Sequence, residues 1–248
     1  MYVKKVWIIL AFIFVADWAS FSMAEDMVLA VDDWCPYICD LSSSSQGIML
    51  DILKDIFKPA GKNVSFQKFP LTRGIREVQL NHVQGIVGIL PTMAADLIFP
   101  RQPLLTTQFC FFTLSDSKWK FKGFHQKYDD VLIGVIEGKE IGPLFNKAFS
   151  HRTEVLGVDQ SVSRLIKMLR KRRIDILIEE KNVVASTLKK GKMATLRMAG
   201  CLAEKNEFVG FSPSNPRSKE YAEIFEKGIL KLKKNEKIQT IIKRYIED

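Results

Sequence analysis

Residues 64–90 read VSFQKFPLTRGIREVQLNHVQGIVGIL, and the pattern of this stretch indicates an α/β fold. It begins with an expected strand at residues 64–69, which is followed by an amphipathic helix and a second strand at residues 85–90. Thr72 is expected to cap the helix. A strand, a helix and a strand in this order predict a parallel unit with a right-handed crossover.

The same pattern continues in both directions from this stretch. A strand at residues 27–31 and a helix at residues 49–60 precede it, and Gly61 ends that helix. A second pass of strand, helix, strand, helix and strand follows, with Ser161 expected to cap its second helix; it covers residues 131–136, 141–149, 154–158, 161–169 and 174–178. Two passes about 100 residues apart predict two α/β lobes, each with a mostly parallel, doubly wound sheet.

Two extended apolar runs, at residues 106–114 and 208–212, separate and follow the passes. We expect them to be strands that cross between the lobes and form a two-strand hinge. Two amphipathic helices, one starting at Ser218, close the chain and supply apolar faces that the first lobe lacks. The predicted first lobe is residues 25–115 plus 207–248, and the predicted second lobe is residues 116–206.

The N-terminus has the pattern of a cleaved secretory signal. Lys4 and Lys5 precede an apolar stretch at residues 6–15, and the small residues Ser22 and Ala24 follow it. A membrane anchor is the alternative, but a spanning helix needs about 20 apolar residues. We therefore expect residues 1–24 to be a signal peptide and the mature protein to lie in the periplasm.

Charge and cysteine content limit the possible partners. The formal net charge is +9, and the basic runs after residue 160 resemble the solvated faces of amphipathic helices. An exported protein rarely meets nucleic acid, so no nucleic-acid partner is expected. The three histidines lack ligand-like spacing to the four cysteines, so disulfides are expected rather than a metal site. Cys35 and Cys39 flank a turn at Pro36 and should pair, and Cys110 and Cys201 are candidates for a second pair near the hinge.

Ligands of open α/β sheets bind beyond the carboxyl ends of the strands. This rule selects four segments, which should face one cleft between the lobes: residues 32–37, 90–92, 137–139 and 179–182. Trp34 and Tyr37 lie in the first segment and could stack on a flat or cationic ligand. The alternative is that both rings plug the edge of the lobe.

Pieces of sequence distributed over the whole mature chain resemble a known family. They are residues 33–37 (DWCPY), 47–52 (GIMLDI), 69–73 (FPLTR), 88–103, 133–135 (IGV), 173–175 (RID), 211–213 (FSP) and 241–245 (IIKRY). Their order resembles the bacterial extracellular solute-binding proteins of family 3, the polar amino-acid-binding group of type II periplasmic binding proteins. The Trp-Cys-Pro-Tyr form resembles one subgroup of that family.

The resemblance implies roles for particular residues. Thr92 falls where family members grip a ligand carboxylate, but the arginine that follows three residues later in amino-acid binders is Ala95 here. This departure argues against an ordinary α-amino acid as the ligand. Arg73, near a helix N-terminus, is then the cationic candidate for ligand contact, unless it pairs with Glu77 four residues on.

Glu180 matches the acidic residue that holds a ligand ammonium group in the family. The alternatives are a solvated loop charge at Glu180 or an exchange of roles with the adjacent Glu179. Asp51 and Asp175 match positions that serve the fold more than the ligand.

The resemblance implies a monomeric binding protein that captures a small polar molecule and delivers it to an inner-membrane ABC permease. No cofactor and no metal are implied, and no motif for nucleophilic catalysis is visible, so we do not expect an enzyme. Two alternatives remain: a component that presents its ligand to a sensor, and a periplasmic dehydratase-like enzyme on the same fold that uses Glu180 as acid and base.

Overall fold

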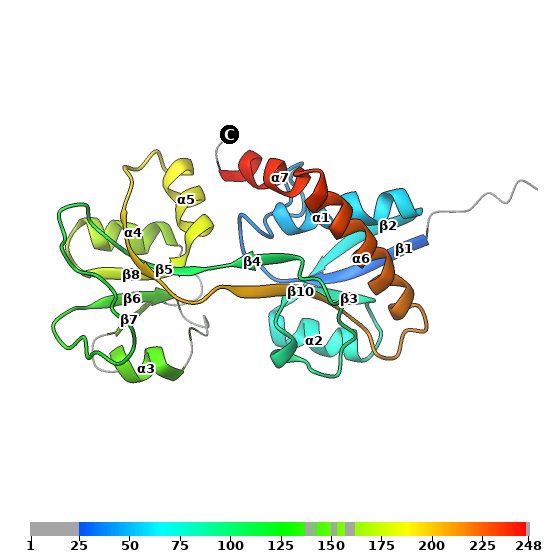
Figure 1. Ribbon diagram of the computed structural model, residues 1–248, viewed down its shortest axis with the longest axis horizontal. Helices are drawn as coiled ribbons and strands as arrows, with labels where there is room; N and C mark the ends of the chain where they lie inside the picture. Colours follow the sequence, from blue (N-terminus) through cyan, green and yellow to red (C-terminus); the bar gives the residue numbers. More distant parts are fainter. Residues whose placement is uncertain (1–24, 137–140, 142, 150–152, 157–161, 247–248) are drawn as a thin grey trace, which may run out of the picture.

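Two five-stranded sheets organise the protein (Figure 1). The computed structural model describes residues 25–136, 141, 143–149, 153–156 and 162–246. The expected signal peptide, the segment at residues 137–139 and the cap at Ser161 therefore lie outside the described residues. No helix in the described part is long and apolar enough to span a bilayer.

The first sheet has the order β2-β1-β3-β10-β4. Its strands are β1 (Glu25–Val31), β2 (Lys62–Lys68), β3 (Gly85–Ile89), β4 (Leu105–Thr107) and β10 (Lys205–Phe211). Strand β1 pairs in parallel with β2 and β3, whereas β10 runs antiparallel to β3 and β4. The carboxyl ends of the three parallel strands therefore lie at one edge of this sheet.

The second sheet repeats this arrangement with the order β7-β6-β8-β5-β9. Its strands are β5 (Phe109–Thr113), β6 (Ile133–Ile136), β7 (Thr153–Leu156), β8 (Ile176–Glu180) and β9 (Arg197–Cys201). Strand β6 is parallel to β7 and β8, and β5 is antiparallel to β8 and β9. We call each sheet with its helices a lobe.

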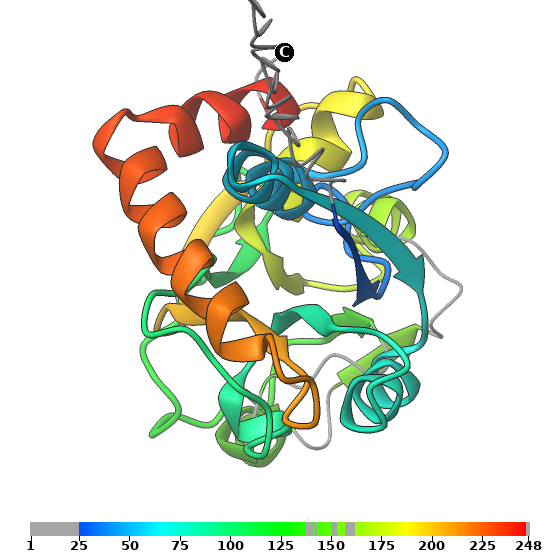
Figure 2. The same ribbon diagram turned by 90° about the vertical axis from the view of Figure 1, so that its right-hand side faces the viewer.

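Helices cover both faces of the first sheet (Figures 1 and 2). Helices α1 (Ile48–Phe57), α6 (Ser218–Lys234) and α7 (Lys237–Ile246) share one apolar core, which includes Tyr221, Phe225 and Ile241. Helix α2 (Leu71–Gln79) packs on the opposite face. The C-terminal helices thus supply apolar surface to the first lobe, because α6 and α7 both contact α1.

The second lobe has the same layered build. Helices α4 (Val162–Arg170) and α5 (Lys181–Lys190) lie on one face of its sheet, and α3 (Pro143–Phe149) lies on the other (Figure 1). Asp175 stabilises this lobe locally, because its carboxylate accepts a hydrogen bond of 2.8 Å from the backbone N–H of Leu132.

Two crossings join the lobes. Strands β4 and β5 are separated only by Gln108, and β9 and β10 are separated by residues 202–204. A hydrogen bond connects the two crossings: the side-chain amide of Gln108 donates to the backbone carbonyl of Leu202 at 3.1 Å. The sheets therefore divide at these residues, a few positions before the expected boundaries at 115 and 207.

Two expectations about helices need correction. Thr72 does not cap α2, because the helix begins at Leu71 after Pro70, which has no side-chain cap. Helix α5 and strand β9 have no counterpart among the expected elements, because the polar and basic residues of α5 obscure its apolar period and β9 is a short strand that contains a glycine.

Candidate functional site

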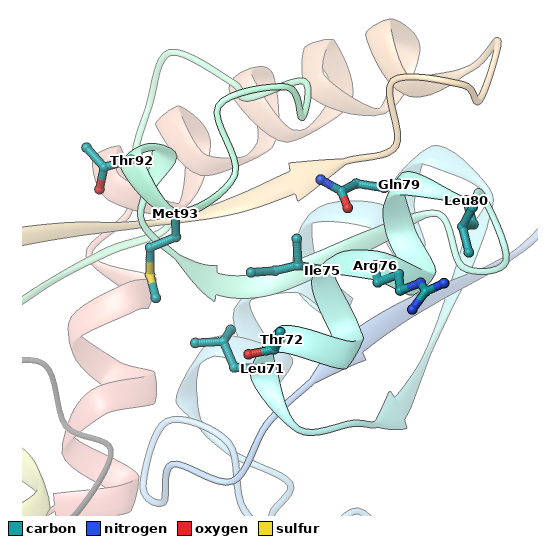
Figure 3. A pocket seen from close by; sticks show the side chains of 8 residues that line it. All are labelled: Leu71, Thr72, Ile75, Arg76, Gln79, Leu80, Thr92 and Met93. Atoms are coloured by element: carbon teal, nitrogen blue, oxygen red, sulfur yellow. The ribbon is translucent and has the colours of Figure 1, made fainter.

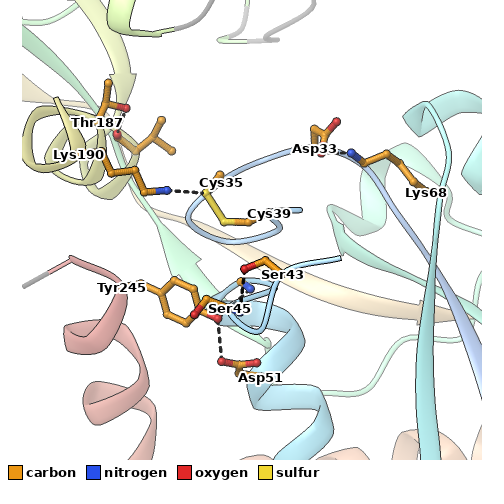
Figure 4. The surroundings of a disulfide bond; sticks show 12 residues. Asp33, Cys35, Cys39, Ser43, Ser45, Asp51, Lys68, Thr187, Lys190 and Tyr245 are labelled. Carbon is orange, nitrogen blue, oxygen red and sulfur yellow. Dashed lines mark hydrogen bonds and ion pairs between the residues drawn. A yellow bond between two sulfur atoms is a disulfide. The ribbon is translucent and has the colours of Figure 1, made fainter. Parts of the chain in front are cut away.

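The loop after β1 is a small cross-linked ring. A disulfide joins Cys35 and Cys39, with their Cα atoms 4.5 Å apart, as the sequence predicts (Figure 4). Backbone hydrogen bonds of 2.9 Å in both directions join Trp34 and Ile38. The rings of Trp34 and Tyr37 lie against each other, with centroids 4.7 Å apart. The cross-linked ring closed by Cys35 and Cys39 thus holds both aromatic side chains at the carboxyl end of β1.

Tyr37 reaches across to the second lobe. Its side chain is buried, and its hydroxyl accepts a hydrogen bond of 2.8 Å from the Asn182 amide at the start of α5. The same hydroxyl is hydrogen-bonded to the carboxylate of Glu180. Burial raises the pKa of Tyr37 above its usual range, and the negative charge of Glu180 adds to this shift. Tyr37 is therefore a neutral bridge between the lobes.

Glu180 is buried at the end of β8 and caps α5. Its carboxylate accepts hydrogen bonds from the backbone N–H groups of Asn182 (2.7 Å) and Val183 (3.1 Å). It also accepts one of 3.3 Å from the N–H of Gln108, the residue between β4 and β5. These contacts satisfy donors that a helix start leaves unpaired. The carboxylate is engaged within the protein and is not presented to solvent.

Further contacts place α5 against the first lobe. The Lys190 ammonium lies 3.3 Å from the sulfur of Cys35 (Figure 4). Val183 packs into the core cluster of the first lobe, and α5 contacts α7. One side of the junction between the lobes is thus closed by protein.

Arg73 and Thr92 lie in the first lobe and are both exposed. The Arg73 guanidinium pairs with Glu77 at 3.4 Å and lies over the Phe69 ring, 5.5 Å from its centroid. Thr92 belongs to a short 3-10 helix, η2 (Pro91–Met93), that follows β3. Ala95, the position of the missing arginine, is also exposed.

A groove of about 820 Å³ runs between α2 and η2 (Figure 3). Four apolar residues, two threonines, a glutamine and an arginine line it: Leu71, Ile75, Leu80, Met93, Thr72, Thr92, Gln79 and Arg76. Thr92 and Met93 lie at one end of it, and Arg76 and Leu80 lie toward the other. Of the five expected ligand contacts, this groove contains only Thr92.

Sequence reasoning missed Arg76 and Asn182. Arg76 is one turn further along α2 than Arg73, which pairs with Glu77, and the position of η2 makes Arg76 the arginine that lines the groove. Asn182 lies in one of the segments that the strand-end rule selects, but nothing in the sequence indicates that it meets Tyr37. No group of three or more potential metal ligands occurs in the part of the chain that the structure describes.

The architecture can now be compared with known proteins. No family model matches the chain, and no curated protein matches it in sequence. Solved structures match it over nearly its whole length. The fold is that of a type II periplasmic binding protein.

Three of these solved structures illustrate the kinds of protein that share the fold. Substrate-binding domain 2 of GlnP from Lactococcus lactis, in an open conformation, is 19% identical, with a TM-score of 0.65 over 91% of this chain and 99% of that chain. An ancestral cationic amino acid solute-binding protein is 15% identical, with a TM-score of 0.70 over 91% and 97%. A histidine kinase sensor domain with similarity to periplasmic binding proteins is 14% identical, with a TM-score of 0.67 over 91% and 97%.

These identities establish the fold and leave the ligand open. The fold is shared with a substrate-binding domain of a putative amino acid ABC transporter from Streptococcus pneumoniae, and also with a sensor domain. The comparisons give no support for the narrower Trp-Cys-Pro-Tyr subgroup. A second disulfide joins Cys110 to Cys201, and two disulfides are typical of an oxidising compartment outside the cytoplasm.

Proposed function

We propose that the protein is an exported solute-binding protein that traps a small polar molecule between its lobes and delivers it to an inner-membrane ABC permease. The observation that carries this proposal is the repeated sheet order. The backbone passes between two sheets of the same order only twice, at Gln108 and at residues 202–204. Such a connection allows the lobes to rotate about few backbone bonds.

The proposed site lies at the carboxyl ends of the parallel strands, with Trp34 and Thr92 contacting the ligand. Trp34 is half-buried on the cross-linked ring, and Thr92 is exposed in the groove. Tyr37 and Glu180 have a different proposed role, because both are buried and bonded to each other across the lobes. In this proposal Tyr37 and Glu180 hold the two lobes in their relative position.

The two lobes in this proposal divide close to the expected boundaries at 115 and 207, with β5 in the second lobe, β10 in the first, and the bending itself at the crossings. The expected cleavage after Ala24 would release the mature chain into the periplasm, where it acts as a monomer. We propose binding rather than catalysis, because the carboxylate of Glu180, the candidate acid and base, is fully occupied by protein donors.

Mass spectrometry of the small molecules retained by the purified, undenatured protein tests this proposal. We expect one species, released on denaturation, that stabilises the protein when it is added back. A ligand at 100 times its dissociation constant adds about 2.7 kcal/mol to the free energy of unfolding. Absence of any retained species, together with no thermal shift from an extract of the periplasm, would contradict the proposal.

A sensor that presents its ligand to a receptor kinase is the second candidate, and the match to a histidine kinase sensor domain favours it. Deletion of the gene separates the two roles. Loss of uptake of the retained molecule indicates transport. Unchanged uptake with a lost transcriptional response to that molecule indicates sensing.

A further inference from the structure

The groove beside α2 carries information about the chemistry of the ligand, if the proposed function holds. A carboxylate is the side chain that pairs with an ammonium group, and none of the described residues that line the groove is acidic. Asp33 pairs with Lys68 at 2.6 Å, and both oxygens of Asp96 accept from the Gln79 amide, at 3.0 and 3.2 Å. Asp32 accepts from the N–H groups of Asp33 and Leu71.

Glu77 on α2 and Glu180 at the start of α5 are also paired. Glu77 is held by Arg73 at 3.4 Å and by His82 at 2.8 Å. Glu180 accepts three backbone hydrogen bonds and the Tyr37 hydroxyl. These acidic side chains are thus already partnered within the protein, and none of them is among the residues that line the groove.

The charge that lines the groove is positive. Arg76 is the one ionisable residue among those that line it, and within the described residues its guanidinium has no ion pair or hydrogen bond. A guanidinium binds a carboxylate through two parallel hydrogen bonds. The apolar side chains of Ile75 and Met93 extend the lining from Arg76 toward Thr92 (Figure 3).

We propose that this groove binds a small monocarboxylate that has an apolar body and no ammonium group. Its carboxylate pairs with Arg76, and its hydrocarbon part lies on Ile75 and Met93. Thr72 and Thr92 supply hydroxyls along the same surface. Anion and apolar surface together separate this class from zwitterionic amino acids, which need a partner for each charge.

Calorimetric titration of the full mature protein with four matched probes tests the class. Hexanoate is the reference, norleucine adds only the α-ammonium group, 1-hexanol removes the charge, and butyrate removes two methylenes. We expect norleucine and 1-hexanol to bind at least tenfold more weakly than hexanoate. Butyrate should bind about 15-fold more weakly, since each buried methylene is worth about fourfold in affinity.

The Arg76→Ala variant locates the carboxylate. We expect hexanoate binding to weaken at least tenfold and 1-hexanol binding to change less than twofold. Arg101→Ala is the matched control, because the Arg101 side chain is 93% exposed in the same lobe and outside the groove. Arg76→Gln, which keeps a polar side chain but removes the charge, should lose affinity in the same way, and urea unfolding confirms that each variant is folded.

Three results would overturn the inference: norleucine binding as tightly as hexanoate, Arg73→Ala weakening hexanoate more than Arg76→Ala does, or no probe binding at millimolar concentration. These results leave the proposed function testable separately. A zwitterionic molecule retained by the native protein would contradict the ligand class and support the binding role. Retention of no small molecule would contradict the binding role itself.

Discussion

Three parts of the molecule meet at Glu180. The carboxylate caps α5, accepts from the N–H of Gln108 in one crossing, and is bonded to Tyr37 from the other lobe. Each contact satisfies a donor that is otherwise removed from water. Glu180 thus connects a helix, a hinge strand and the cross-linked ring through one side chain.

Glu180→Ala should destabilise the protein by about 2–4 kcal/mol, because it removes a helix cap and leaves buried N–H groups unpaired. Urea unfolding of the mature protein measures this cost. Glu204→Ala is the control, because Glu204 is exposed, and its effect should stay within about 0.5 kcal/mol. Equal unfolding midpoints for both variants would show that the cap contributes nothing.

The stability of the wild type should also depend on pH through Glu180. Burial raises the pKa of this carboxyl above the usual glutamate range, against the opposing hydrogen bonds. The folded state therefore holds the proton more tightly than the unfolded chain. That contribution is complete below the usual glutamate pKa and is lost as the pH rises through the raised value.

Glu180→Gln removes this titration. The free energy of unfolding of the wild type, relative to Glu180→Gln, should therefore fall as the pH rises from about 4 toward neutrality. Urea titrations at several pH values measure the difference, with Glu204→Gln as the exposed control. A difference that stays constant or increases with pH would contradict the assigned direction.

At the scale of elements, α5 and the Cys35–Cys39 ring form the contact that closes one side of the junction. The 2.8 Å bond between Asn182 and Tyr37 is its centre, and Lys190 lies beside Cys35 at the other end of α5. Tyr37 is buried although it lies in a loop, so its hydrogen bond to Asn182 is not an ordinary surface contact. The contact therefore has a measurable energy.

A double-mutant cycle with Tyr37→Phe and Asn182→Ala should give a coupling energy of about 1 kcal/mol, the net value of a typical hydrogen bond. Chemical unfolding of the four proteins measures it. The pair Tyr37→Phe and Thr240→Ala is the control, because Thr240 is exposed on α7. Strict additivity of Tyr37→Phe and Asn182→Ala would show that the two side chains do not interact in solution.

The two disulfides should differ in what they contribute. Cys110 and Cys201 are 91 residues apart in sequence, whereas Cys35 and Cys39 are four apart. Loop-closure entropy gives about 4–5 kcal/mol for the first cross-link and about 2 kcal/mol for the second. Replacing each pair by alanines and measuring urea unfolding should show the larger loss for the long loop. A larger loss at the short ring would mean that it stabilises by other means.

For the whole molecule, the sequence predicts the architecture better than the site. Alternating strands and amphipathic helices are long-range patterns, so both lobes and the packing of α6 and α7 could be predicted. Glu180 illustrates why the site is harder to predict from the sequence than the architecture is. Glutamate is not a preferred helix cap, and α5 is polar enough to lack a clear apolar period, so the sequence indicates a free charge at a strand end.

The site also depends on contacts between residues distant in sequence. Tyr37 and Asn182 are 145 residues apart, and only the folded arrangement of the lobes makes them partners. Arg73 and Arg76 are equally basic, and the nearby Glu77 and η2 decide which of them is engaged within the protein and which lines the groove. The spacing of Arg73 and Glu77 offers their pairing as one alternative, but local sequence contains neither the contact of Tyr37 with Asn182 nor the position of η2.

Small-angle X-ray scattering measures whether the two lobes close on a ligand, as we propose. The mature protein, stripped of its retained small molecule by denaturation and refolding, is measured alone and after that molecule is added back. We expect a smaller radius of gyration with the ligand, because the lobes rotate about Gln108 and residues 202–204. Identical scattering curves with the ligand bound at saturation would contradict it.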